Sequence, residues 1–331
     1  MPMARKRRPP EHDPKRSLVQ LRFQRKHSSA LRHAVRLVCQ ACHLAGSKRL
    51  VDDVRASLEA EGVRDAIRNH DTAALFDWLV GTLSYQGISD RVAAGYMERH
   101  GRVTWQDIAS DLGHEPSCPK LESFWHFQDC RYNKTRFTCN EPDHIARCSL
   151  PTFWLRNGRL NQTACSLYLF VRDVAGGDLV GWVDQRLVAA TEQNSPNPVA
   201  SMRQALLDPL REVYGVSDKV LTMALSELLL AAPRPYQRRW TTVGASMIAV
   251  DTLVHHFLHR TGILHRFAAD HAYGPACYQH DGCAEIIERV AHRIDARQFN
   301  PRFPQVFPRF VQFAMWRYRI ELRPMATSCG C

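Results

Sequence analysis

Residues 210–225 read LREVYGVSDKVLTMAL, a pattern of two helices joined by a three-residue hairpin. Gly215 opens the hairpin, and glycine adopts backbone conformations with positive φ that other residues rarely adopt. Such a turn leaves backbone N–H groups at the start of the second helix, where a phosphate group can bind. The stretch therefore predicts a helix-hairpin-helix unit in which Gly215, Val216 and Ser217 contact a phosphate.

A second stretch, MIAVDTLVHHFLHRTG at residues 247–262, places the carboxylate of Asp251 at the start of a helix after an apolar approach. An aspartate in this position most often acts only as an N-cap, which is the alternative interpretation. Asp184, in the segment GWVDQRL, also follows an apolar run. We rank Asp184 second because no hairpin precedes it.

Helical periodicity covers most of the chain outside these two stretches. Alternating strand patterns are nearly absent, so the sequence predicts a mainly α-helical fold. Residues 232–246 are rich in Pro and Arg and are expected to form a loop. We expect helices at residues 31–45, 51–67, 73–83, 91–100, 105–112, 162–174, 201–214, 218–231, 251–260, 283–296 and 306–320.

The net charge of +11 is concentrated near the N-terminus. Residues 1–33 contain ten Lys and Arg against two acidic residues, so the rest of the chain is close to neutral. We therefore predict a basic disordered arm at residues 1–30 with general affinity for nucleic acid. A tail that only aids solubility is the alternative. Residues 31–331 are predicted to form one helical domain.

The apolar residues of this chain are dispersed in short runs. No stretch approaches the ~20 apolar residues of a membrane helix. The basic N-terminus is not followed by the apolar core of a secretory signal. We therefore expect an intracellular protein that does not enter a membrane.

The sequence holds eleven cysteines, and four of them cluster within residues 113–151. Because nothing indicates secretion, metal binding explains such a cluster better than disulfides do. The aromatic residues around the cluster favour a [4Fe–4S] cluster, with zinc or no metal as the alternatives. The predicted ligands are Cys118, Cys130, Cys139 and Cys148.

Three other groups of possible ligands give weaker signals. Cys39 and Cys42 form a C-x-x-C inside a helical pattern and are interpreted as buried apolar residues. Cys277 and Cys283 flank the segment YQHDG and could form a second site, although two ligands make a weak case. The histidines that follow Asp251 could share a metal face, with an ordinary helix surface as the alternative; they are His255, His256 and His259.

In their order along the chain, these segments resemble the helix-hairpin-helix DNA glycosylase superfamily, and within it the endonuclease III-like group. The resemblance rests on TLSYQGISD at residues 82–90, GVSDK at 215–219 and IAVDT at 248–252. NGRLNQTA at 157–164 is similar to a helix start between the first two blocks. The matching blocks span roughly residues 73–320, with large insertions between them. Ser217 stands where the family hairpin usually has a second glycine.

The resemblance assigns a role to one residue in each block. It implies that Gln86 enters the space of the flipped base, with Tyr85 as a second candidate. It implies that Lys219 is the Schiff-base lysine of bifunctional members and that Asp251 is the essential aspartate. The alternatives are a plain loop residue for Gln86 and a solvated surface residue for Lys219.

These residue types suit the chemistry of base excision. Cleavage of an N-glycosidic bond develops positive charge on the sugar, and an ionised carboxylate such as Asp251 stabilises that charge. The amine of Lys219 can attack the sugar carbon and form an imine, which would add AP-lyase activity. The base must first leave the duplex, because its glycosidic bond is inaccessible within the stack.

The resemblance also implies an architecture and a partner. We expect two lobes, with residues 73–112 and 155–231 on one side of a cleft and the chain ends with the Asp251 helix on the other. The expected protein is a monomeric hydrolase of DNA repair that excises a damaged, modified or mispaired base from double-stranded DNA.

Two other functions remain open at this point. A non-catalytic DNA-binding protein could keep the hairpin and the metal module without any reaction. An iron–sulfur enzyme that modifies RNA or nucleotides is the third hypothesis. The absence of a C-x₃-C-x₂-C radical motif weighs against that third hypothesis.

Overall fold

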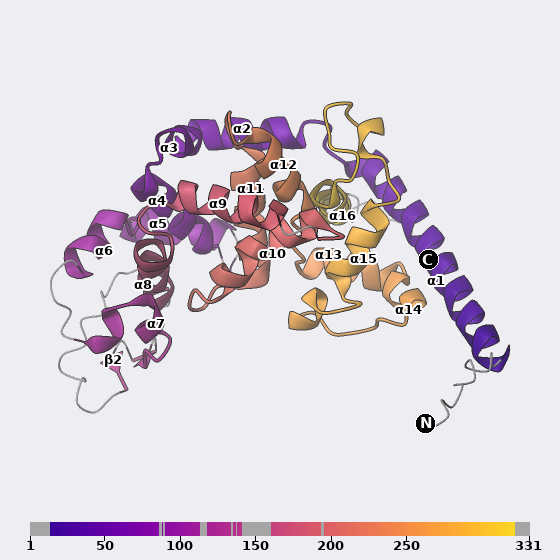
Figure 1. The fold of residues 1–331 in the computed structure, drawn as a ribbon, viewed down its shortest axis with the longest axis horizontal. Helices are drawn as coiled ribbons and strands as arrows, with labels where there is room; N and C mark the ends of the chain where they lie inside the picture. Colours follow the sequence, from indigo (N-terminus) through magenta and orange to yellow (C-terminus); the bar gives the residue numbers. More distant parts are fainter. Residues whose placement is uncertain are drawn as a thin grey trace, which may run out of the picture.

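The computed structural model describes residues 14–85, 88, 90–112, 118–133, 135, 136, 138–140, 160–192 and 195–321. Within these residues the protein is mainly α-helical, as the sequence predicts, and Figure 1 shows the helices in an elongated arrangement. The described strands form one short antiparallel ladder, in which β1 (Tyr132–Asn133) pairs with β2 (Thr138–Cys139). None of the described helices has the length and apolar character needed to span a membrane.

Most helices lie where the hydrophobic periodicity places them. The α-helices of the first half are α1 (Pro14–Ala45), α2 (Leu50–Ala60), α3 (Val63–Asn69), α4 (Thr72–Leu83), α5 (Asp90–His100), α6 (Trp105–Leu112), α7 (Phe124–Phe127) and α8 (Asn161–Leu169). Those of the second half are α9 (Leu179–Glu192), α10 (Pro198–Arg211), α11 (Asp218–Leu230), α12 (Gln237–Ser246), α13 (Thr252–Arg260), α14 (Ile263–Phe267), α15 (Cys283–Ala291) and α16 (Pro308–Glu321). A π-helical turn, Phe170–Val174, follows α8 directly.

Local sequence signals explain where several helices begin and end. The side chain of Asp71 caps α4 by accepting a hydrogen bond of 3.0 Å from the N–H of Ala74. Gly62, at φ 74°, divides the helix expected at residues 51–67 into α2 and α3. A left-handed residue at this point ends one helix and lets the next begin in a new direction.

The structure differs from the sequence-based expectations in two segments. Residues 1–13 of the predicted arm lie outside the described residues, and residues 14–30 belong to α1, which runs from Pro14 to Ala45. Proline fits the first position of a helix, and no further Pro or Gly interrupts the segment before Gly46. The expected loop at residues 232–246 contains α12, whose buried Trp240 and Val243 pack into the protein interior.

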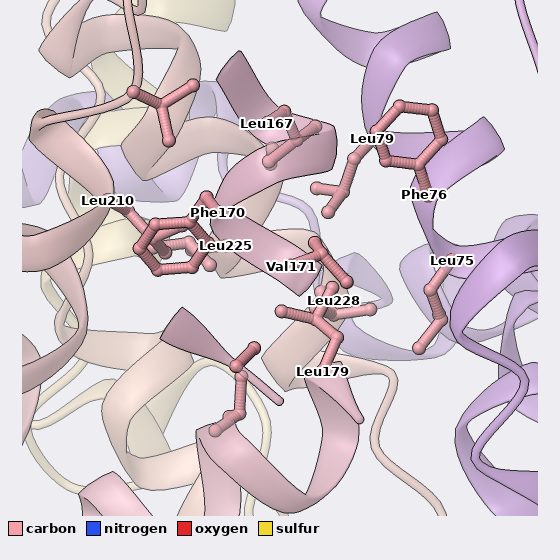
Figure 2. Packing of buried hydrophobic residues seen from close by; sticks show 14 of the residues in the cluster. Leu75, Phe76, Leu79, Leu167, Phe170, Val171, Leu179, Leu210, Leu225 and Leu228 are labelled. Carbon is pink, nitrogen blue, oxygen red and sulfur yellow. The ribbon is translucent and has the colours of Figure 1, made fainter. Parts of the chain in front are cut away.

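A first hydrophobic cluster is built from the middle of the chain, mainly from α4, α8, α9, α10 and α11. Figure 2 shows side chains of these helices converging on one interior, among them Phe76 of α4 and Leu167 of α8. Phe76 and Phe170 are fully buried. Removal of such apolar surface from water is the main source of stability for this part of the protein.

A second hydrophobic cluster joins the first described helix to the last four. It contains buried residues of α1, α13, α14, α15 and α16. In Figure 1, α1 lies at one end of the molecule beside α14, and α6 and α7 lie at the other end. Helices α11 and α12 supply residues to both clusters, and Val54 of α2 packs against both.

Candidate active site and metal centre

A cavity of about 590 Å³ opens where the two clusters meet. Helices α4 and α11 supply one part of its wall, and α16 together with the start of α13 supplies another. Four aromatic residues line it: Trp78, Tyr85, Phe313 and Trp316. Its charged lining residues are Glu61, Lys219, Glu227, Asp251 and Arg309. The cavity therefore combines ring surfaces with charges of both signs.

The cavity brings together residues from all three sequence blocks that carry the resemblance. Tyr85 comes from the first block, Lys219 from the second and Asp251 from the third, and each lines the cavity. These residues are far apart in the sequence, so the fold alone assembles them. Gln86 lies outside the described residues.

Asp251 is the N-cap of α13 and a wall residue of the cavity at the same time. Its Oδ1 accepts a hydrogen bond of 2.8 Å from the N–H of Val254. No described residue forms a hydrogen bond with Oδ2 of this carboxylate. This residue therefore both caps α13 and lines the cavity.

The backbone in front of Asp251 is held by a tyrosine from a distant segment. The hydroxyl of Tyr278 accepts a hydrogen bond of 2.8 Å from the N–H of Val250 and donates one of 3.3 Å to the carbonyl of Val250. Tyr278 belongs to a 3₁₀ turn, Pro275–Tyr278. The position of Asp251 is therefore fixed on its N-terminal side by this turn.

The predicted hairpin forms between α10 and α11. Gly215 adopts φ 74°, and Ser217 is the N-cap of α11, as expected for a helix-hairpin-helix turn. Asp218, the first residue of α11, forms an ion pair with Arg211, with 2.7 Å between Oδ1 and Nε. This pair offsets the negative charge that Asp218 brings to the hairpin.

Lys219 follows as the second residue of α11 and is half-buried. Among the described residues, none forms an ion pair with its ammonium group. The amine lines the cavity, so it is placed to meet a molecule that enters. Val216, between Gly215 and Lys219 in the chain, packs against the first cluster and anchors the hairpin there.

A buried arginine brings positive charge to the wall of the cavity beside Asp251. The Arg309 side chain is 11% exposed, and its Nη2 lies 3.8 Å from Oε1 of Glu227. Burial lowers the pKa of Arg309, while the nearby carboxylates of Glu227 and Asp251 act in the opposite direction. Burial raises the pKa of Glu227, and the charge of Arg309 opposes that rise. Arg309 also donates a hydrogen bond to the Gln312 side chain.

Asp184, the rival of Asp251, has a structural role in the first cluster. Its Oδ1 accepts hydrogen bonds of 3.0 Å from Nε1 of Trp240 and 3.1 Å from Nη1 of Arg239. Asp184 is absent from the lining of the cavity. The carboxylate therefore joins α9 to α12 and lies outside the cavity lining that contains Asp251.

The predicted four-cysteine module is not assembled by the described residues. Cys148 lies outside them, and Cys118, Cys130 and Cys139 are absent from the described groups of ligand atoms that lie within 4.8 Å of one another. Cys118 and Cys130 instead pack against the first cluster. Burial raises the pKa of Cys130, and the nearby thiols of Cys118 and Cys139 act in the same direction.

A different set of residues can bind a metal ion. Ligand atoms of His255, His271, Cys277 and Cys283 all lie within 4.8 Å of one another. Sγ of Cys283 is 3.4 Å from Nδ1 of His255 and 3.4 Å from Nε2 of His271, and Sγ of Cys277 is 3.5 Å from Nδ1 of His255. A group of two thiols and two imidazoles can hold an ion such as zinc, and it differs from the four-thiolate arrangement that the sequence predicts.

Burial and hydrogen bonds shift the pKa values of the side chains in this group. The hydrogen bond from the Cys283 thiol lowers the pKa of Cys277 to about 5, and burial acts against this shift. The same hydrogen bond, together with burial, raises the pKa of Cys283. Burial lowers the pKa of His255, so its ring is neutral in the folded protein at neutral pH.

Sequence reasoning found three of the four residues but did not connect them. His255 was expected to share a face with His256 and His259, yet the last two are exposed while His255 is buried. Cys277 and Cys283 were expected as an isolated pair. His271 was missed, and the signal that could have found it is its place between His255 and the two cysteines.

Searches against protein families, curated proteins and solved structures found no match to this chain.

Proposed function

We propose that the protein is a DNA glycosylase of the helix-hairpin-helix type, which flips a damaged, modified or mispaired base out of double-stranded DNA and hydrolyses its N-glycosidic bond. The observation that carries the proposal is the convergence of Tyr85, Lys219 and Asp251 on one cavity. The cavity volume of about 590 Å³ falls within the usual range of small-molecule sites, about 300–1,000 Å³.

The aromatic wall suits a flipped base. Trp78, Tyr85 and Trp316 offer ring faces, and enzymes that act on flipped bases commonly stack the base between aromatic or apolar side chains. Arg309 and Gln312 add polar groups on the α16 side of the same cavity. A base held among these groups would be selected by its hydrogen-bonding edge as well as by its shape.

Asp251 is the group we propose to stabilise the sugar cation. The N-terminus of α13 and the nearby guanidinium of Arg309 both bring positive charge close to this carboxylate. The Oδ1 cap holds the carboxylate in place, so that little reorganisation is needed as charge develops on the sugar. Water then completes the hydrolysis at the sugar carbon.

Lys219 is the group we propose for a second, lyase step. Its amine would attack C1′ of the abasic sugar that hydrolysis leaves, and loss of one water would give an imine to the opened sugar. Elimination of the 3′ phosphate from that imine would cut the DNA strand. In this proposal the enzyme is bifunctional, and Lys219 and Asp251 act on the same sugar from the hairpin and from α13.

The hairpin and the basic N-terminal region are proposed to bind the DNA backbone. The positive end of α11, which follows the hairpin, suits a phosphate. The ten Lys and Arg of residues 1–33 supply charge that attracts DNA without regard to sequence. The proposed enzyme acts as a monomer inside the cell, where its DNA substrate is found.

The test is incubation of the purified protein with a panel of duplexes that each carry one modified or mismatched base. Formation of an abasic site in at least one duplex, and no release from the matched normal duplex, would support the proposal. Salt-sensitive DNA binding without base release from any duplex would instead support the alternative of a non-catalytic DNA-binding protein.

A further inference from the structure

The four residues His255, His271, Cys277 and Cys283 come from four successive segments. They belong to α13, to the connection after α14, to the turn Pro275–Tyr278 and to the first position of α15. We infer that they bind one zinc ion in a closed structural site, and that this ion fastens the connection between α14 and α15 to the helix that Asp251 caps.

The spacing of the ligand atoms fits a single tetrahedral ion. Zinc bonds of about 2.3 Å to sulfur and about 2.0–2.1 Å to nitrogen place neighbouring sulfur and nitrogen ligands about 3.6 Å apart. Three sulfur–nitrogen separations in the group are 3.4, 3.4 and 3.5 Å. The ligand atoms therefore already lie close to the edges of the required tetrahedron.

The same separations argue against an iron–sulfur cluster at this place. Where two histidines and two cysteines hold a two-iron cluster, the cysteines bind one iron and the histidines bind the other. Here each described sulfur lies 3.4 or 3.5 Å from an imidazole nitrogen, which leaves space for one ion between them. Two thiolates and two imidazoles around one ion are a common zinc set.

A hydrogen bond outside the group prepares one ligand for the metal. Nδ1 of His271 lies 2.7 Å from the carbonyl oxygen of Ala269. A carbonyl can only accept, so Nδ1 carries the proton and Nε2 presents its lone pair to the ion. Metal-binding histidines are usually oriented by such a second hydrogen bond.

Burial indicates a structural site and not a catalytic one. Cys277 and Cys283 are fully buried, and His255 is 4% exposed. Four protein ligands fill a tetrahedral site, which leaves no position for a substrate or a reactive water. The ion would therefore act on the fold and would take no part in a reaction.

The proposed ligands are attached to the chain on both sides of Asp251. His255 lies in the first turn of α13, four residues after Asp251. Cys277 precedes Tyr278, whose hydroxyl holds Val250, the residue before Asp251. An ion that joins His255 to Cys277 therefore fixes the backbone before and after Asp251. The zinc site does not depend on the proposed reaction, and its test needs no DNA.

The first measurement is the metal content of the purified full-length protein, together with X-ray absorption at the zinc edge. We expect one zinc per chain, with a first shell of two sulfur and two nitrogen ligands. A shell of four sulfurs would overturn the proposal, and so would protein that neither contains zinc nor takes it up after incubation with zinc chloride.

The second measurement compares cysteine variants. Cys277→Ser and Cys283→Ser should each lose the zinc, whereas Cys118→Ser and Cys42→Ser should keep it; Cys42 is a matched control because it is also buried. Loss of zinc from Cys118→Ser with retention in Cys277→Ser would place the metal in the 113–151 region and overturn the proposal.

The third measurement covers the case in which the serine variants do not fold. Cobalt(II) loaded into the wild-type protein should show the visible bands of a tetrahedral ion together with sulfur-to-cobalt charge transfer. His271→Cys should keep the ion and strengthen the charge-transfer band, because a third thiolate replaces an imidazole. Cobalt spectra without sulfur-to-cobalt charge transfer would overturn the proposal.

Discussion

The backbone N–H of His255 donates a hydrogen bond of 3.0 Å to the carbonyl oxygen of Asp251. The two residues therefore share the first turn of α13, one with its carboxylate on the cavity and the other with its ring in the His/Cys group. A change in the position of His255 can therefore shift Asp251 in the wall of the cavity, because this turn of helix connects the two residues.

Asp251→Asn should abolish base release and leave DNA binding intact. Asparagine caps a helix about as well as aspartate, so the fold should be preserved while the negative charge is lost. The loss of one electrostatic contact to the transition state predicts a fall in the single-turnover rate of roughly 10²-fold or more. Asp184→Asn is the matched control and should keep its activity. Unaltered turnover in Asp251→Asn would remove this carboxylate from the mechanism.

Borohydride should trap a covalent adduct between Lys219 and DNA on a substrate that the enzyme cleaves. Reduction of the imine fixes the protein to the sugar, and the adduct migrates as a larger species on a denaturing gel. Lys219→Gln should give no adduct, whereas Lys120→Gln, a variant of the exposed lysine paired with Asp129, should still give it. Base release without any adduct from the wild-type protein would mean a monofunctional enzyme.

Removal of zinc should lower the thermal stability of the protein. An ion present at a hundred times its dissociation constant stabilises the folded state by about 2.7 kcal/mol, which corresponds to roughly 4 °C in Tm for a chain of this size. Differential scanning calorimetry with and without a chelator measures this shift. The Cys277→Ser variant should not respond to the chelator, and an equal response in that variant would assign the effect to something other than this site.

The contact between His70 and Asp178 should make stability depend on acid pH. Burial tends to raise the pKa of Asp178, but hydrogen bonds from the N–H of Gly181 and from His70 outweigh it, and the pKa is lowered. A carboxyl group whose pKa is lower in the folded state contributes stability above its unfolded pKa of about 3.9, and that stability is lost as the pH falls through the folded value.

Asp178→Asn should therefore flatten the stability profile at acid pH. Urea unfolding between about pH 6 and pH 2 should show a smaller fall in the free energy of unfolding for the variant than for the wild-type protein. Asp208→Asn offers a comparison, since Asp208 is an exposed carboxylate paired with Arg211 within α10. Parallel curves for Asp178→Asn and the wild-type protein would contradict the prediction.

Much of the helical fold could be predicted because periodicity is a local property. Leu75, Phe76, Leu79 and Val80 mark the buried face of α4, and Asp71 marks its start. Helix α12 was missed because Pro233 and Pro235 precede it closely and its polar residues hide the spacing of Trp240 and Val243. The packing of those two residues, and not their propensity, makes the segment helical.

The residues of the candidate sites come together through contacts between distant segments of the chain, and local sequence patterns do not reveal such contacts. Asp251 could be predicted to line the cavity because its cap and its apolar approach lie in one stretch, and Lys219 because it follows a hairpin. The His/Cys group was not predicted, because four clustered cysteines are a stronger local signal than ligands separated by five to fifteen residues. Only the fold shows that α13 and the start of α15 lie side by side, so that His255 meets Cys283.

The packing of α1 against α14, α15 and α16 has a consequence for how the chain can be divided. Ala34, Val38 and Ala41 of α1 are buried in the second cluster, while Lys48 and Arg49 in the link to α2 are exposed. A protease that cuts this link would therefore leave both fragments associated. The protein could therefore be produced as two separate polypeptides that associate through the second cluster.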